Sequence, residues 1–387
     1  MKHFSHLNTA AEITGMYSGS QPFHFFIKDF FRQYKKYGST DRKQITHLCY
    51  CYFRLGQAGK NKPLQQAITE ALFLCSDQHN DLLAAIKPEW NEKAGASIEE
   101  KCALLNIPPG SLKIFPYPGA LSNGINEADF NFSHLTQPDV FIRVRPGHQQ
   151  AVTGKLKQAG ITFTLQHPNC ISLPAATKID ELLHVNKDVV IQDYSSQRAG
   201  EFMQLAVPGS NLKVWDCCAA SGGKSILAKD ILGDIDLTVS DIRPAVLANL
   251  KKRFSEAGIN NYKILATDLT RPFKAPQQNS FDLIIADAPC TGSGTWGRTP
   301  ERLSFFNEKE IDSYTRLQKK IVTTVLASLQ SGGYFLYITC SVFKKENEEV
   351  VNFIQTNLAV GLVKMEVIKG YTLKADTMFA ALFRKSI

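Results

Sequence analysis

Short apolar runs alternate with helix-like segments throughout the second half of the chain. The runs are rich in β-branched and aromatic residues, and they predict strands at 213–217, 237–240, 262–266, 281–286 and 333–338, with two more at 364–369 and 378–384. Helical spacing of apolar residues predicts helices at 224–232, 244–257, 308–329 and 345–357. This alternation predicts an α/β fold, a mostly parallel, doubly wound sheet with helices on both faces, over residues 196–387.

The first part of the chain has helical periodicity instead. Apolar residues recur every three to four positions, which predicts helices at 23–37, 45–53, 63–74 and 97–105. Thr40 or Asp41 is expected to cap the second of these helices. Cys49 and Cys51 are interpreted as core residues. We therefore predict a helical domain over residues 1–107.

Two shorter segments separate these halves. Residues 108–135 are rich in Pro and Gly and predict a linker. Residues 136–195 alternate like a small α+β subdomain, with strands at 139–145, 161–165, 171–173 and 189–192 and a helix at 149–159. Arg143 and Arg145 make its first strand basic. Contact with RNA and a solvated surface are both compatible with that pattern.

Composition limits the class of protein. The chain has 387 residues, 44% of them hydrophobic and 21% charged, which is typical of a globular protein of two or three domains. The net charge of +8 is compatible with an anionic partner such as nucleic acid. Nine cysteines without CxxC spacing argue against a metal site. Without a signal peptide or a run of about 20 apolar residues, we expect a cytoplasmic protein with free thiols and no membrane contact.

A glycine-rich turn follows the first strand of the predicted sheet. Gly222 and Gly223 allow a close approach to a ligand at a helix start. A P-loop needs a glycine where Cys218 stands, so ATP is disfavoured. Asp241 and Asp268 end the next two strands, and each alone could be a helix cap. In series they predict an S-adenosylmethionine pocket, with NAD as an alternative that lacks its GxGxxG motif.

Two cysteines occupy similar places further along the chain. Cys290 and Cys340 each follow a strand-like run and precede a turn, which places both at the carboxyl edge of the sheet, where ligands bind. Two thiols on that edge indicate covalent chemistry beside a nucleotide-like cofactor. A buried strand-end thiol is the alternative for either one.

These stretches together resemble the Sun/RsmB family of RNA 5-methylcytosine methyltransferases over roughly residues 130 to 387. The similar stretches are 192–197, 216–225, 241–244, 266–268, 287–294, 337–341 and 376–384. Residues 39–45 more faintly resemble a NusB-like RNA-binding domain. Two positions depart from the family: Ser221 stands where proline is usual, and Gly297 where a second basic residue is usual beside Arg298.

The resemblance implies a reaction and a site. Cys340 is implied to attack carbon 6 of cytosine, Asp287 to contact the ring nitrogen, Cys290 to assist proton removal from carbon 5 and release of the adduct, and Lys224 to orient the base or Asp287. The residues expected at the S-adenosylmethionine pocket are Cys218, Ala219, Ala220, Ser221, Gly222, Gly223, Lys224, Asp241, Asp268 and Asp287.

The resemblance also implies the substrate. A paired cytosine cannot present carbon 6 to a thiol, so the target must be unpaired or flipped out. Arg143, Arg145, Trp296 and Arg298 are the candidate RNA contacts, although Trp296 could equally pack within its loop. Ribosomal RNA, specifically 16S, is the expected partner of a monomeric enzyme. Transfer RNA, a catalytically idle RNA-binding assembly factor and a nicotinamide-dependent oxidoreductase are the alternatives.

Overall fold

The computed structural model describes residues 2–108, 110–206, 211–271 and 280–386. Contacts divide these residues into two compact units. The first, which we call the helical unit, consists of the residues up to Gly119 together with Asn126–Gln137 and Trp296–Asn307. The second, the sheet unit, consists of Ala120–Ile125, Pro138–Thr295 and the residues from Glu308 onward. A compact unit need not be a domain that folds independently. The predicted domain boundaries at residues 107, 135 and 195 therefore stay predictions.

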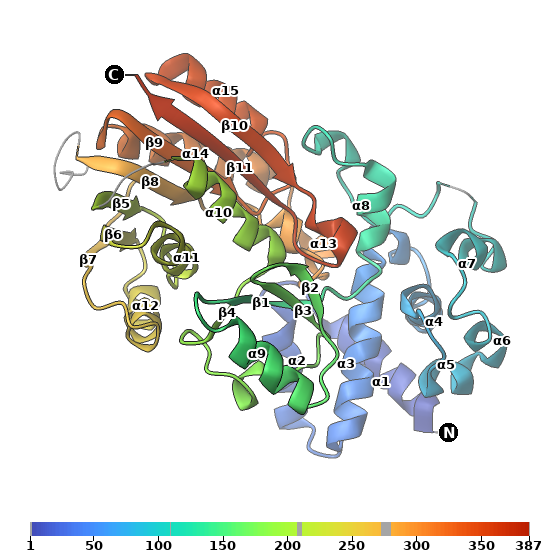
Figure 1. The fold of residues 1–387 in the computed structure, drawn as a ribbon. Coiled ribbons are helices and arrows are strands. Elements are labelled where there is room, and N and C mark those ends of the chain that lie inside the picture. Colours follow the sequence, from blue (N-terminus) through green and yellow to red (C-terminus); the bar gives the residue numbers. More distant parts are fainter. Residues whose placement is uncertain (1, 109, 207–210, 272–279, 387) are drawn as a thin grey trace. The chain divides into compact units, whose positions relative to one another are not determined.

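The helical unit packs short helices around an aromatic core. Phe23, Phe53 and Phe73 are fully buried in it. The Arg54 guanidinium is also buried, and it donates to the carbonyl oxygens of His134, Thr136 and Gly297, which ties distant segments to α3. The helices are α1 (Lys2–Met16), α2 (Phe23–Gln33), α3 (Ser39–Arg54), α4 (Leu64–Cys75), α5 (Asp81–Ile86), α6 (Pro88–Asn91), α7 (Ile98–Leu104), α8 (Glu127–Ser133) and α13 (Arg302–Phe305) (Figure 1).

Several details of the helical prediction were wrong. The helix α1 was not predicted, and α8 lies within the segment expected to be irregular. The helix α2 ends at Gln33, before the predicted end at 37. Neither Thr40 nor Asp41 caps α3: Gly38 is the N-cap residue, and the Asp41 carboxylate accepts a hydrogen bond from the Gly38 backbone N–H at 3.2 Å.

The sheet unit contains two sheets. The predicted strands and helix of residues 136–195 form a four-stranded antiparallel sheet in the order β2-β3-β1-β4, with α9 (Gln149–Gln158) following β1. Its strands are β1 (Val140–Val144), β2 (Thr164–His167), β3 (Cys170–Leu173) and β4 (Val189–Ile191).

The larger sheet has the order β10-β11-β9-β8-β5-β6-β7 and is parallel from β9 to β7 (Figure 1). The strands β10 and β11 are antiparallel additions at one edge. The predicted Rossmann-like α/β fold is therefore confirmed. The strands are β5 (Leu212–Asp216), β6 (Ile235–Asp241), β7 (Lys263–Ala266), β8 (Phe281–Asp287), β9 (Leu329–Thr339), β10 (Val360–Ile368) and β11 (Met378–Lys385).

Helices cover both faces of this sheet because successive strand residues point to opposite sides. Val214 packs in a core with α10 (Tyr194–Ala206), α11 (Gly223–Leu232) and α12 (Pro244–Glu256). Its neighbour Trp215 packs in the opposite core with α14 (Lys309–Leu326) and α15 (Glu348–Asn357). The helix α10 was not predicted. No helix among the described residues is both long and apolar enough to cross a membrane.

Candidate active site

The crevice of the large sheet lies between β5 and β8. The chain leaves β5 toward β6 and β7 and then returns to the other side of β5 as β8. Ligands of open α/β sheets bind at the carboxyl ends of the strands at such a switch point. The loops after β5 and β8 contain the glycine-rich turn and Cys290, so two of the predicted motifs meet at this edge.

The glycine-rich turn has a backbone that only glycine accommodates at Gly222. Its φ is +85°, and an added Cβ would lie 2.5 Å from the Phe254 ring. A Cβ on Gly223 would meet nothing within 4 Å, so the start of α11 faces open space. The departure at Ser221 has a structural use here, because Arg253 donates hydrogen bonds to both its carbonyl oxygen (3.0 Å) and its hydroxyl (2.7 Å).

Two carboxylates follow the next strands of the sheet. Asp241 ends β6 and accepts hydrogen bonds from the Ala220 backbone N–H at 3.1 Å and from the Arg243 side chain. Although burial opposes ionisation, these hydrogen bonds hold the pKa of Asp241 below its ordinary value. Hydrogen bonds from the Thr270 hydroxyl and N–H likewise lower the pKa of Asp268. Both groups are ionised acceptors at neutral pH.

These features fit S-adenosylmethionine. Asp241 offers a carboxylate to ribose hydroxyls, and a Cβ on Gly223 would meet nothing within 4 Å, so the backbone of the turn is open to a ligand. Ile242 follows Asp241 and is 59% exposed, an apolar surface for an adenine ring that sequence reasoning missed. Arg243 now pairs with Asp241, but its side chain is 60% exposed and free to rotate toward solvent. Asp268 supplies a further acceptor on the same edge.

The two candidate thiols lie side by side. The strands β8 and β9 are parallel neighbours in which Asp287 pairs with Ile338, so the turns that follow both strands meet. The Gly294 N–H donates to the Cys340 carbonyl oxygen at 2.9 Å. The Cys290 and Cys340 sulfur atoms are 3.3 Å apart. Both thiols are half-buried and free of disulfides.

The pair is not symmetric. The hydrogen bond with Cys340 and burial raise the pKa of the Cys290 thiol well above its ordinary value. Cys290 therefore keeps its proton, and a protonated thiol is a poor nucleophile.

A lysine–carboxylate pair stands at the end of β8. The Lys224 ammonium lies 3.2 Å from the Asp287 carboxylate and 2.6 Å from the Ser196 hydroxyl. Gln192 also donates to the Ser196 hydroxyl, at 3.1 Å. Lys224 is 6% exposed, so these contacts fix its orientation toward Asp287. Sequence reasoning missed Ser196, although it lies within the family-like stretch 192–197.

Comparison with known proteins agrees with this geometry. Residues 202–383 match the family model described as 16S rRNA methyltransferase RsmB/F. This part of the chain is similar to the RsmB/F family. A relative named ribosomal RNA small subunit methyltransferase B, from Proteus mirabilis, is 30% identical over 224 residues, 56% of this chain and 51% of the relative. Its counterpart in Salmonella arizonae is 26% identical, covering 62% and 58% of the two chains. Such alignments span about half the length of these relatives.

Solved structures share the fold of this chain. The crystal structure of PH0851 superposes with a TM-score of 0.71 and 19% identity, covering 99% of this chain and 98% of that one. The structure of NSun6 from Pyrococcus horikoshii with SFG superposes with a TM-score of 0.61 and 16% identity, covering 71% and 100%. At these identities the likeness shows the fold alone.

Three of the predicted RNA contacts serve the protein itself. Arg143 and Arg145 both pair with Asp230, at 2.5 and 2.8 Å, and Arg143 is 5% exposed. Trp296 is buried in the helical unit beside the rings of Phe115 and Phe306, as the packing alternative expects. We do not include these three residues in the RNA interface that we propose. Arg298 is half-buried.

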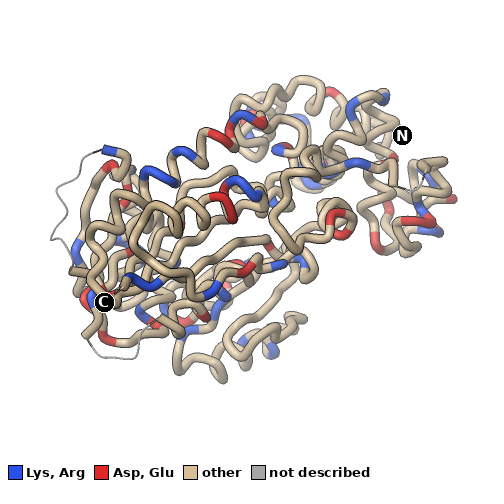
Figure 2. Tube along the Cα trace, turned by 90° about the horizontal axis from the view of Figure 1, so that it is seen from above, with Lys and Arg blue, Asp and Glu red and all other residues tan. Residues whose placement is uncertain are grey.

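Charge alone does not locate an RNA interface on this chain. Figure 2 shows Lys and Arg interspersed with Asp and Glu along the tube. Pairs of opposite charge are frequent among the described residues, for example Lys263 with Asp236 and Lys345 with Asp312. The net charge of +8 is therefore spread along the chain rather than concentrated in a single run.

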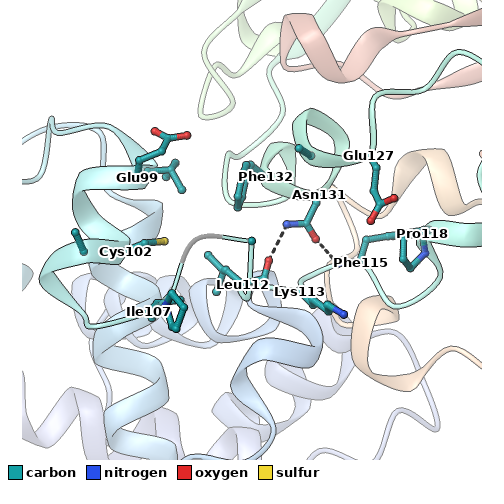
Figure 3. A pocket seen from close by; sticks show the side chains of 15 residues that line it. Glu99, Cys102, Ile107, Leu112, Lys113, Phe115, Pro118, Glu127, Asn131 and Phe132 are labelled. Carbon is teal, nitrogen blue, oxygen red and sulfur yellow. Dashed lines mark hydrogen bonds between the residues drawn. The ribbon is translucent and has the colours of Figure 1, made fainter.

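A cavity of about 480 Å³ lies in the helical unit, and none of the predicted site residues is among those that line it (Figure 3). Its walls are largely apolar and include Ile107, Leu112 and Phe132. Burial and the nearby Glu99 carboxylate raise the pKa of its one thiol, Cys102, which keeps that thiol protonated. We do not place chemistry there. No group of three or more His, Cys, Asp or Glu side chains in the described part of the chain could hold a metal ion.

A buried carboxyl at the end of β5 predicts a pH-dependent stability. Burial raises the pKa of Asp216 from 3.8 to about 7, opposed by the hydrogen bond from Ser225. Between these values the folded protein keeps a proton that the unfolded chain releases, so stability is lost as pH rises toward 7. We expect Asp216→Asn to remove this loss. The unfolding free energy of the variant relative to wild type should rise by about 4 kcal/mol from pH 4 to pH 8 in urea titrations.

The matched control for this titration is Asp234→Asn, because the Asp234 side chain is 91% exposed. Its difference from wild type should stay constant over the same pH range. A flat difference for Asp216→Asn as well would show that Asp216 ionises normally in the folded protein.

Gly294 predicts a large effect of a single methyl group. A Cβ at this position would lie 1.9 Å from the Thr377 carbonyl oxygen and 3.0 Å from that of Cys340. Because these are backbone atoms, Gly294→Ala must displace the Cys290 turn. We expect the variant to lose about 3 kcal/mol of stability, measured by urea unfolding. Gly361→Ala is the control, because its added Cβ would meet nothing within 4 Å; an equal loss in both would contradict the steric explanation.

Proposed function

We propose that this protein is an S-adenosylmethionine-dependent RNA cytosine-C5 methyltransferase that acts on 16S ribosomal RNA through a covalent bond between Cys340 and carbon 6 of cytosine. The observation that carries the proposal is the pair of sulfur atoms 3.3 Å apart, on the sheet edge that also holds the Lys224–Asp287 pair. The match of residues 202–383 to the RsmB/F family model supports it.

The reaction requires a nucleophile because carbon 5 of cytosine is itself poorly nucleophilic. Attack by the Cys340 thiolate forms a bond from sulfur to carbon 6 and moves electron density toward the ring nitrogen and carbon 5. That nitrogen takes up a proton as it gains density, and the protonated Asp287 carboxyl is the proposed donor, which recovers the proton when the ring re-forms. Lys224, held by Ser196, keeps the Asp287 carboxyl group in place.

Carbon 5 can then take a methyl group. S-adenosylmethionine supplies that group as an electrophile when it is bound along the glycine-rich turn, Asp241, Ile242 and Asp268; a structural relative with SFG, an analogue of this molecule, supports the choice. Once Cys340 is bonded to carbon, the hydrogen bond that held the proton on Cys290 is weakened. Cys290 releases its proton to solvent and then removes the proton from carbon 5. The carbon 6–sulfur bond breaks in the same step, and its electron pair returns to the Cys340 sulfur.

The relatives' names favour ribosomal RNA over transfer RNA as the substrate. We propose that residues 1–107 form a NusB-like RNA-binding domain, 108–135 a linker, 136–195 an RNA-binding subdomain and 196–387 the methyltransferase domain. We further propose a monomer in the cytoplasm, since a reducing compartment keeps Cys290 and Cys340 as thiols. An idle assembly factor would have no use for this pair of adjacent thiols.

The direct test is transfer of tritium from methyl-labelled S-adenosylmethionine to 16S ribosomal RNA, followed by bisulfite sequencing. We expect label in the RNA and one or more protected cytosines. Transfer RNA is the parallel substrate, and labelling of that RNA alone would favour the transfer-RNA enzyme. Binding of RNA without transfer of label to either RNA would favour the assembly factor.

A further inference from the structure

Glu346 is a fully buried carboxylate between the two candidate thiol loops. It lies between β9 and α15, six residues after Cys340, and is 0% exposed. We propose that Glu346 is the positioning residue that holds the Cys290 and Cys340 loops together, so that the two sulfur atoms keep their separation. This inference rests on the proposed function for its consequence in catalysis, although its geometry is independent of it.

Four donors converge on this carboxylate. One oxygen accepts from the Thr291 backbone N–H at 2.9 Å and from the Gln318 side-chain amide at 3.0 Å. The other accepts from the Thr291 hydroxyl at 2.5 Å and from the Ser341 hydroxyl. Thr291 follows Cys290 directly and Ser341 follows Cys340 directly. One side chain therefore binds the residue next to each thiol.

The neighbours of Glu346 complete the connection. Gln318 donates to the Pro289 carbonyl oxygen at 3.0 Å with the same amide that contacts Glu346, so the Cys290 turn is held on both sides. Asn347 donates to the Ser341 carbonyl oxygen at 2.9 Å. Hydrogen bonds to a charged acceptor are about twice as strong as neutral ones, so Glu346 is the strongest member of this network.

The charge of Glu346 has a second effect on the thiols. Its carboxylate is among the causes that raise the pKa of Cys290, after the Cys340 hydrogen bond, burial and the Cys340 charge. A negative charge behind Cys290 disfavours a second thiolate in the pair. Glu346 thus also helps to keep Cys290 as the protonated thiol of the pair.

Two substitutions separate position from charge. Glu346→Gln can keep the network: its amide oxygen accepts from the Thr291 N–H and Gln318, and its NH₂ donates to the two hydroxyls, which can accept. Glu346→Ala removes the acceptor that these four buried donors share and weakens the connection between the two loops. Because misplacement of a reacting group by about 1 Å can cost about 100-fold in rate, we expect E346A to lower kcat about 100-fold. E346Q should stay within about tenfold of wild type, and Kd for S-adenosylmethionine should not change in either variant.

A readout that needs no RNA measures the thiol separation itself. Phenylarsine oxide bridges two adjacent thiols, forming two arsenic–sulfur bonds and releasing one water. Peptide mass spectrometry should find Cys290 and Cys340 bridged in wild type and E346Q, and the bridge reduced at least tenfold in E346A. Cys340→Ala is the negative control for that peptide pair. If the bridge depends on Glu346 but RNA is never methylated, the proposed function fails while the positioning role stands.

Glu348→Ala is the matched control variant. Glu348 is 6% exposed and accepts from the Ser122 hydroxyl and the Asn123 N–H, so it is a buried acceptor that binds neither thiol loop. It should lower stability without changing the arsenical bridge or kcat. A folded E346A with wild-type kcat and bridging would overturn the proposal. If E346A does not fold, the Thr291→Val variant tests the proposal instead. Full kcat and full bridging in Thr291→Val would overturn the positioning role of Glu346, and a loss of about tenfold in kcat would support it.

Discussion

Cys340→Ala is expected to lower methyl transfer to RNA by about 10⁴-fold or more, the scale seen when an enzyme loses its nucleophile. Without the Cys340 sulfur, no bond to carbon 6 forms and carbon 5 stays unreactive. Cys290 does not replace it, because burial and its hydrogen-bond partner keep its thiol protonated. Initial rates with methyl-labelled S-adenosylmethionine and 16S ribosomal RNA measure the effect.

The control for this variant removes a thiol elsewhere. Cys102 lines the cavity of the helical unit, and Cys102→Ala should keep wild-type turnover. Binding of S-adenosylmethionine to Cys340→Ala should also be unchanged, because Asp241, Ile242 and Asp268 follow other strands. Turnover above about one hundredth of the wild-type rate in Cys340→Ala would assign the nucleophile to another group.

The strands of the large sheet and the pairing of its motifs were predictable from the sequence. The apolar runs that end at Asp216, Asp241 and Asp287 are buried on both faces, as parallel strands are, and such runs are distinct in a chain of mixed composition. Because parallel strands end on one edge, the sequence also predicted that Cys290 and Cys340 both lie on that edge. Their separation of 3.3 Å required the register of β8 on β9.

What the sequence did not reveal depends on partners far along the chain. Glu346 follows Lys344 and Lys345, a charged stretch that is typical of an exposed helix start. Its partners Thr291 and Gln318, however, are 55 and 28 residues away in the sequence. Nothing in the local pattern indicates that these donors converge on it. A polar residue becomes a buried acceptor only when the fold brings its donors together.

The basic strand of the small subdomain shows the same limitation. Arg143 and Arg145 suggested a surface for RNA, but both side chains pair with Asp230, 87 and 85 residues later, within the sheet unit. An ion pair between distant residues has no signature in a single sequence. The helix α10 was also missed; it packs against α11 and β11.

Cys290→Ala is expected to accumulate a covalent RNA–protein complex while turnover falls about 10³-fold, within the range that general acid–base catalysis contributes. Cys340 keeps its sulfur and can still bond to carbon 6. Without the Cys290 sulfur, the proton on carbon 5 is not removed and the carbon–sulfur bond does not break. The complex should appear as a band of reduced mobility on denaturing gels after incubation with RNA and S-adenosylmethionine.

The double variant Cys290→Ala/Cys340→Ala establishes which sulfur forms the bond. It should give no retarded band, because the trapped atom would be the Cys340 sulfur. A band that persists in the double variant would place the bond on another residue, and the absence of a band in Cys290→Ala with normal turnover would remove Cys290 from the release step. Since the two sulfur atoms are 3.3 Å apart, a difference between the two single variants can only come from their protonation and their orientation toward the base.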